Sequence, residues 1–66
     1  MKSESYEQTI YRLRDEIHSL TEKQTDAMET ETFIGLTRDE TKAYEARRLQ
    51  IANLIRQLRL LEAVAA

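Results

Sequence analysis

One short motif in this 66-residue chain could hold a metal ion. Asp15 and His18 stand three residues apart, close to the Glu-x-x-His spacing of di-iron carboxylate bundles. Glu45 or Glu62 could complete the carboxylate set in a paired assembly. Such a site must project into a bundle, whereas Ile17 occupies the apolar face and turns Asp15 and His18 away from it. We therefore expect no metal and no other cofactor.

The sequence contains few residues in an arrangement that could support catalysis. The chain has no cysteine, no glycine-rich phosphate loop and a single histidine, His18, followed by Ser19. Adjacent residues on a helix point in different directions, so these two side chains do not form a working pair. A bundle of this size also lacks room for a pocket of a few hundred Å³. The sequence predicts a protein that is not an enzyme.

Four arginines in the second half could contact nucleic-acid phosphates: Arg47, Arg48, Arg56 and Arg59. On a helical projection Arg47 is separated from the other three, and the net charge of −2 disfavours phosphate binding. Binding through Arg48, Arg56 and Arg59 remains an alternative. The shape it requires resembles Rop-like helical hairpins, which dimerise and bind RNA, although no motif is shared.

Composition points to a small, folded, soluble, all-α domain. Proline, cysteine and tryptophan are absent, glycine occurs once, and 33% of the residues are charged. No run approaches the ~20 apolar residues that span a bilayer, and the first residues have no apolar signal region. We expect a cytoplasmic protein with no membrane partner.

The first half shows a single helical stripe. Apolar or core-compatible residues recur every three or four positions: Tyr6, Ile10, Leu13, Ile17, Leu20, Gln24 and Ala27. This spacing predicts a helix over about 3–29. Threonines then weaken helix propensity and Gly35 permits a reversal, so we expect a turn over about 30–36. Phe33 and Ile34 are expected to plug the closed end.

The second half begins with a capping box, because Thr37 and Glu40 have the spacing in which each can bond to the other's amide. It predicts a helix over about 37–64, with one apolar face at Tyr44, Ile51, Leu54, Ile55, Leu58 and Leu61. Residues 1–66 thus form one antiparallel two-helix hairpin. Folding the helices on each other pairs Gln24 with Tyr44. A polar layer is expected near the closed end, formed by Gln24 with Thr41 and Arg47 or Arg48.

The charge is divided between the halves, at −4 for residues 1–36 and +2 for residues 37–66. We expect pairing between the helices, of the kind Asp15 or Glu16 could make with Arg56 or Arg59.

The second helix carries an additional apolar stripe. Leu49 and Leu60 lie at about 160° and 180° from Ile51, and one partner helix cannot cover both faces. A hairpin this small also buries too little apolar surface to be comfortably stable alone. We expect homodimerisation into a four-helix bundle, with interface candidates Tyr44, Leu49, Ile51, Ile55, Leu58, Leu60 and Leu61.

These features favour an interaction module that dimerises and presents its outer faces to another protein. Tyr11 lies outside the main stripe and could pack against the second hairpin or a foreign partner. Alternatively, the additional stripe belongs to a client, and the chain is a small subunit or co-chaperone that folds on it.

Overall fold

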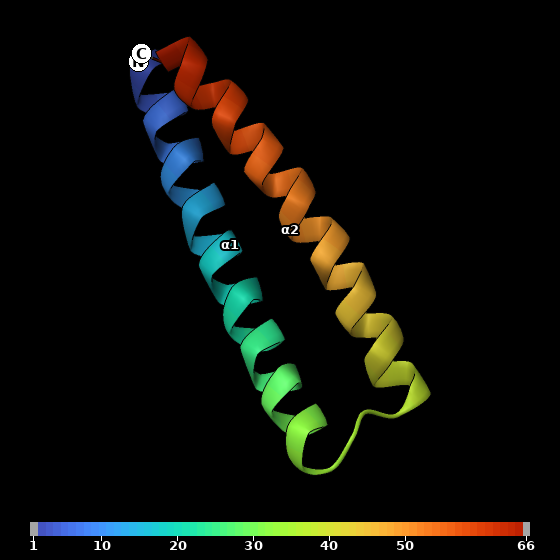
Figure 1. The fold of residues 1–66 in the computed structure, drawn as a ribbon. Coiled ribbons are helices and arrows are strands. Elements are labelled where there is room, and N and C mark those ends of the chain that lie inside the picture. Colours follow the sequence, from blue (N-terminus) through green and yellow to red (C-terminus); the bar gives the residue numbers. More distant parts are fainter. Residues whose placement is uncertain (1, 66) are drawn as a thin grey trace.

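The computed structural model describes residues 2–65 and contains two antiparallel α-helices joined by a short turn (Figure 1). Helix α1 spans Lys2–Phe33 and helix α2 spans Arg38–Ala65. The hairpin is a rod of 49 × 15 × 14 Å, open at the chain ends and closed at the turn. The predicted all-α hairpin is confirmed. Neither helix, as described, has an apolar stretch long enough to cross a membrane.

The interface between the helices follows a heptad pattern. In α1 the buried and half-buried side chains include Ile10, Leu13, Ile17, Leu20, Gln24 and Ala27. In α2 they include Tyr44, Arg47, Ile51, Leu54, Leu58 and Leu61. Alternating steps of three and four keep these residues of each helix turned toward the other helix. We call this row of facing residues the inner seam. Among the described side chains, the apolar ones that are buried are Leu13, at 6% exposed, and Leu54, at 9%, so the core is thin and lies in the open half of the rod.

Helix α1 continues four residues beyond its predicted end. The hydroxyls of Thr30 and Thr32 donate to the carbonyls of Asp26 and Met28, each at 3.0 Å. Each hydroxyl thus finds its acceptor on the carbonyl four residues back, within a continuous helix, and does not compete with the helix by bonding in a turn. The expected stop near residue 29 was therefore wrong, and the helix runs to Phe33.

Gly35 ends the first helix. Its φ of +87° lies in the left-handed region that only glycine adopts without strain. Its amide donates to the carbonyls of Thr30 and Glu31 at 3.1 and 3.2 Å, which satisfies acceptors left open at the helix end.

The closed end is plugged by a different residue from the one expected. Ile34 is 83% exposed, so the expectation that it fills this end was wrong. The side chain of Phe33 lies outside the described residues. Leu36 is half-buried instead and lines a groove on each side of the hairpin. The reason is directional, because Gly35 reverses the chain between Ile34, which points outward, and Leu36, which meets both helices.

Helix α2 starts with the predicted capping box. The Glu40 amide donates to Thr37 Oγ1 at 3.1 Å, and the Thr37 amide donates to Glu40 Oε1 at 2.9 Å. The backbone and side-chain hydrogen bonds from Thr37 hold the pKa of the Glu40 carboxyl below its ordinary value. The start of α2 is thereby fixed within one residue of its predicted position.

One ion pair joins the two helices in the described part of the chain. Arg14 Nη2 lies 2.6 Å from Glu62 Oε2, with both side chains largely exposed. It differs from the expected pairing, in which Asp15 or Glu16 meets an arginine of α2. Exposed pairs of this kind contribute about 0–1 kcal/mol, so this pair adds little to stability.

Candidate functional site

The predicted interface residues of α2 fall on two opposite faces. Five of them are half-buried on the side toward α1: Tyr44, Ile51, Ile55, Leu58 and Leu61. The other two, Leu49 and Leu60, are 62% and 64% exposed and point away from α1. The first group belongs to the hairpin's own interface. The second group is apolar surface on the face of α2 that the hairpin leaves uncovered.

The uncovered surface extends along α2 with its own heptad spacing. We name six positions the outer stripe, and they are Ala46, Leu49, Asn53, Arg56, Leu60 and Ala63. All six are exposed, and they recur in alternating steps of three and four. Val64, beside the stripe, is 65% exposed. A straight seam of this period is the surface a helix presents to a partner helix.

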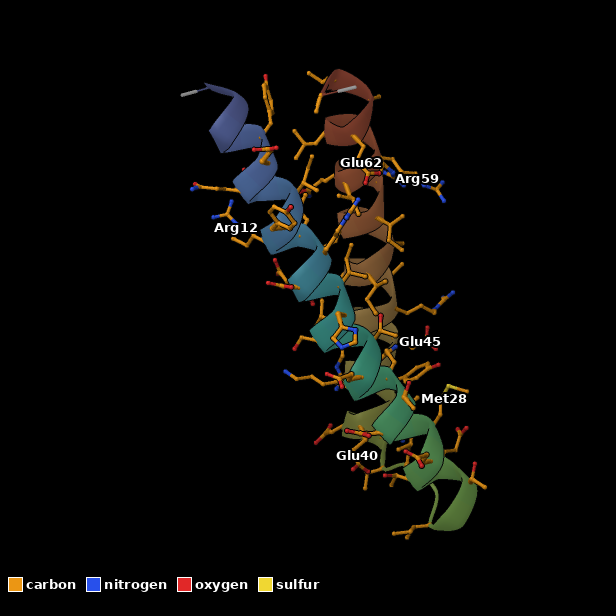
Figure 2. All side chains as sticks on the ribbon, turned by 90° about the vertical axis from the view of Figure 1, so that its left-hand side faces the viewer. Arg12, Met28, Glu40, Glu45, Arg59 and Glu62 are labelled. Carbon is orange, nitrogen blue, oxygen red and sulfur yellow. The ribbon has the colours of Figure 1, made fainter. Side chains whose placement is uncertain are left out.

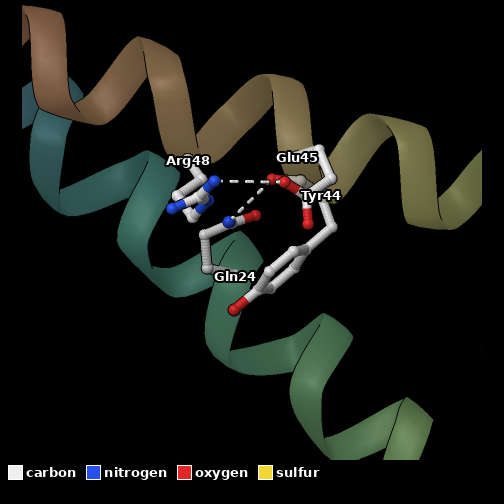
Figure 3. Close-up of polar contacts among 4 residues, drawn as sticks. All are labelled: Gln24, Tyr44, Glu45 and Arg48. Carbon is white, nitrogen blue, oxygen red and sulfur yellow. Dashed lines mark hydrogen bonds and ion pairs between the residues drawn. The ribbon is translucent and has the colours of Figure 1, made fainter.

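A polar cluster interrupts the inner seam toward the closed end (Figure 3). Gln24 is only 8% exposed, and its Nε2 donates to the Tyr44 carbonyl at 3.0 Å. Its Oε1 accepts from Arg47 Nη1 at 2.8 Å, and Arg47 also reaches the Lys23 carbonyl at 3.5 Å. The amide is thus satisfied at both ends, as a buried polar group requires.

The predicted polar layer is confirmed for Gln24 and Arg47, and it differs for Thr41. The predicted facing of Gln24 and Tyr44 is also confirmed. The Thr41 hydroxyl donates to the Thr37 carbonyl at 2.9 Å inside its own helix. The seam position of Arg47, three residues after Tyr44 and four before Ile51, is the signal that identifies it as an inward residue.

The arginines considered for nucleic acid differ in exposure. Arg47 is half-buried against Gln24, whereas Arg48, Arg56 and Arg59 are exposed. Arg48 Nη2 pairs with Glu45 Oε1 at 3.3 Å (Figure 3), Arg56 lies in the outer stripe, and Arg59 projects to the side of α2 (Figure 2). Arg47 is therefore separated from the other three, and the Glu45 carboxylate reduces the positive charge that Arg48 offers to a phosphate backbone.

The Asp15 and His18 motif points to solvent. His18 Nε2 lies 3.7 Å from Glu22 Oε1, and both side chains are more than two-thirds exposed. Among the side chains that the structure describes, those of 6–32 and 34–65, no three potential ligands gather as they would around a metal ion.

Two shallow grooves run along the hairpin near its closed end, one on each side. One, of about 230 Å³, is lined by Leu36 and Glu40, and the other, of about 170 Å³, by Leu36, Met28 and Glu45. Figure 2 shows Glu40 on one side of the rod and Met28 with Glu45 on the other. A hollow of about 410 Å³ lies outside α1, but side chains of that helix alone line it, so it does not enclose a ligand.

The exposed aromatic residue of α1 also lies off the inner seam. Tyr11 is 66% exposed, whereas Tyr6, at the edge of the seam, is 41% exposed and Tyr44 is half-buried. Tyr11 is therefore an isolated apolar side chain on the outside of α1. Single exposed aromatics are ordinary on protein surfaces, so the outer stripe is the stronger candidate site.

No family model matches the chain, and no curated protein or solved structure proved similar to it.

Proposed function

We propose that this chain is a non-enzymatic interaction module that self-associates through the outer stripe of α2, as a dimer in which four helices pack together. The observation that carries the proposal is the pair of leucines, Leu49 and Leu60, exposed at heptad spacing on a face that α1 cannot reach. Surfaces of this kind in small helical proteins are covered by another helix.

The surface area of the hairpin supports the proposal. The chain exposes 5491 Å², whereas a compact monomer of 7.8 kDa exposes about 4,400 Å². The excess of about 1,100 Å² reflects the elongated two-helix rod, and it leaves more surface open than the roughly 800 Å² that each partner contributes to a standard protein interface. A second copy offers a helix face of matching length and period.

The test is a pair of charge substitutions on the outer stripe. Leu49→Glu with Leu60→Glu would place carboxylates in the apolar seam and should convert a dimer into a monomer, measured by light scattering after size exclusion. Tyr11→Glu with Ser19→Glu is the matched control, since it adds the same charge at exposed positions of α1. The control should remain dimeric.

The outcomes separate self-association from binding to another protein. A wild-type chain that is a stable, folded monomer at micromolar concentration contradicts the proposal. Self-association that survives both leucine substitutions assigns the outer stripe to a client instead, as in a small subunit or co-chaperone. If the outer stripe is used for dimerisation, the remaining exposed faces, including Tyr11 on α1, are the surfaces available to a further protein partner.

A further inference from the structure

The outer stripe has a pattern that distinguishes one orientation of a second copy from the other. Its order is small, large, polar, polar, large, small: Ala46, Leu49, Asn53, Arg56, Leu60, Ala63. Read from either end the pattern is the same. We propose that a second copy packs its α2 antiparallel against this stripe, in the register that sets Leu49 opposite the partner's Leu60. This inference rests on the proposed self-association and adds its orientation and register.

The register follows from matching side chains layer by layer. In an antiparallel pair of helices, the stripe positions run in opposite directions, so the first position of one helix faces the last position of the other. Ala46 then meets the partner's Ala63, and Leu49 meets the partner's Leu60. Small residues at the ends let the backbones approach, while the leucines fill the space next to them.

The central layer contains the polar residues and discriminates between orientations. In the antiparallel register Asn53 meets the partner's Arg56, so its amide oxygen can accept from a guanidinium. In a parallel pair Arg56 would meet the partner's Arg56, placing two cations together in the seam. Opposed like charges disfavour such an arrangement, and a polar seam residue commonly fixes register in helix pairs.

The outer stripe points away from α1, so the geometry gives a row of helices in the order α1, α2, then α2 and α1 of the second copy. Val64 lies at the edge of this row. The arrangement differs from a square bundle, in which every helix touches two neighbours.

Cysteine crosslinking tests the orientation, because the natural chain has no cysteine. Three variants are compared under mild oxidation or with a short thiol-reactive linker: Ala46→Cys, Ala63→Cys, and the two together. The antiparallel register predicts covalent dimers for the double variant and only background crosslinking for each single variant. Positions 46 and 63 of one helix lie about 25 Å apart, so they cannot crosslink within a chain.

The outcomes distinguish failure of the orientation from failure of self-association. Light scattering of the same variants under reducing conditions establishes whether a dimer is present. Efficient crosslinking of either single variant in a dimeric sample indicates a parallel pair and overturns the inference, while the proposed function stands. A dimeric double variant that fails to crosslink overturns the register. Absence of any dimer overturns the proposed function itself.

A pair of opposite charges gives a second readout that does not depend on thiol chemistry. Leu49→Glu and Leu60→Lys should each weaken dimerisation at least tenfold, because each puts a charge against a leucine. Combined, they should recover much of the affinity, since the new carboxylate at position 49 faces the new ammonium at position 60 of the second copy only in the antiparallel register. A double variant weaker than both single variants contradicts that register. Circular dichroism checks that every variant keeps its helix content.

Discussion

Gln24 is the buried polar residue in the otherwise mostly apolar inner seam. Its side-chain amide bridges the backbone of α2 at Tyr44 and the guanidinium of Arg47 while being 8% exposed. Removing one member of a buried hydrogen-bonded group leaves its partners unsatisfied, which costs about 1–3 kcal/mol.

Truncation of this side chain should therefore destabilise the hairpin measurably. Gln24→Ala is expected to lower the free energy of unfolding by about 1–2 kcal/mol, because Arg47 loses its acceptor and a space opens in the seam. Urea denaturation followed by circular dichroism measures the change. Thr25→Ala, one residue along on the exposed side, is the control and should stay within about 0.5 kcal/mol of the natural chain. Equal losses in the two variants would show that the bridge has no special role.

Gly35 permits the reversal for a purely conformational reason. A Cβ at this position would meet no atom within 4 Å, so space is not limiting, whereas φ of +87° is strained for any residue with a side chain. Gly35→Ala should cost about 1–2 kcal/mol, and Gly35→Asn should cost less, because asparagine tolerates this region better. Thermal unfolding of the two variants side by side gives the ranking, and an alanine variant as stable as the natural chain would contradict it.

At the scale of the helices, the start of α2 is the best-defined junction. Thr37 and Glu40 satisfy each other's amides, and the lowered pKa of Glu40 means that its carboxylate contributes stability in the folded state. This contribution is fully present above the unfolded pKa of about 4.5 and is lost as the pH falls through the lower, folded value.

A pH series on two cap variants isolates this effect. Thr37→Ala should lower the unfolding free energy by about 1 kcal/mol at pH 7, because the Glu40 amide loses its acceptor. Glu40→Gln keeps a cap acceptor without a titrating carboxyl, so its stability should fall less between pH 5 and pH 3 than that of the natural chain. Parallel acid profiles for Glu40→Gln and the natural chain would contradict a role for this carboxylate.

The helices also show which features a single sequence determines and which it does not. The capping box, the seams and the position of Gln24 depend on local spacing, and each was predictable. The extension of α1 was not predictable from spacing, because it depends on whether the hydroxyls of Thr30 and Thr32 bond to helix carbonyls or take part in a turn. Leu36, and not Ile34, fills the closed end because of the direction that the chain takes after Gly35. The opposite sense of the Arg14 and Glu62 pair arises from side-chain reach across the seam.

For the candidate site, helical spacing separated Leu49 and Leu60 from the opposite apolar face of α2. Spacing did not determine which face α1 covers, because that depends on the placement of α1, which buries the Ile51 face and leaves the two leucines exposed. Coverage of the exposed face by a second copy is a property of the whole assembly, and it is tested at that scale.

For the whole molecule, a thin core should make stability depend on concentration. If dimerisation covers the outer stripe, the midpoint of thermal unfolding should fall on dilution, because mass action favours separated chains. Circular dichroism melts over a hundredfold dilution measure this shift. The Leu49→Glu, Leu60→Glu variant should melt at a lower temperature that does not change with concentration. A natural chain whose midpoint is equally insensitive would behave as a folded monomer.

The confinement of the outer stripe to one helix also limits how large an assembly can grow. An interface made by the same stripe on both copies is isologous, and two-fold symmetry uses both surfaces at once. Each hairpin then has no second equivalent seam with which to recruit a third copy. A rod with two such seams could polymerise into a filament, whereas the proposed pairing through a single stripe would stop at a dimer.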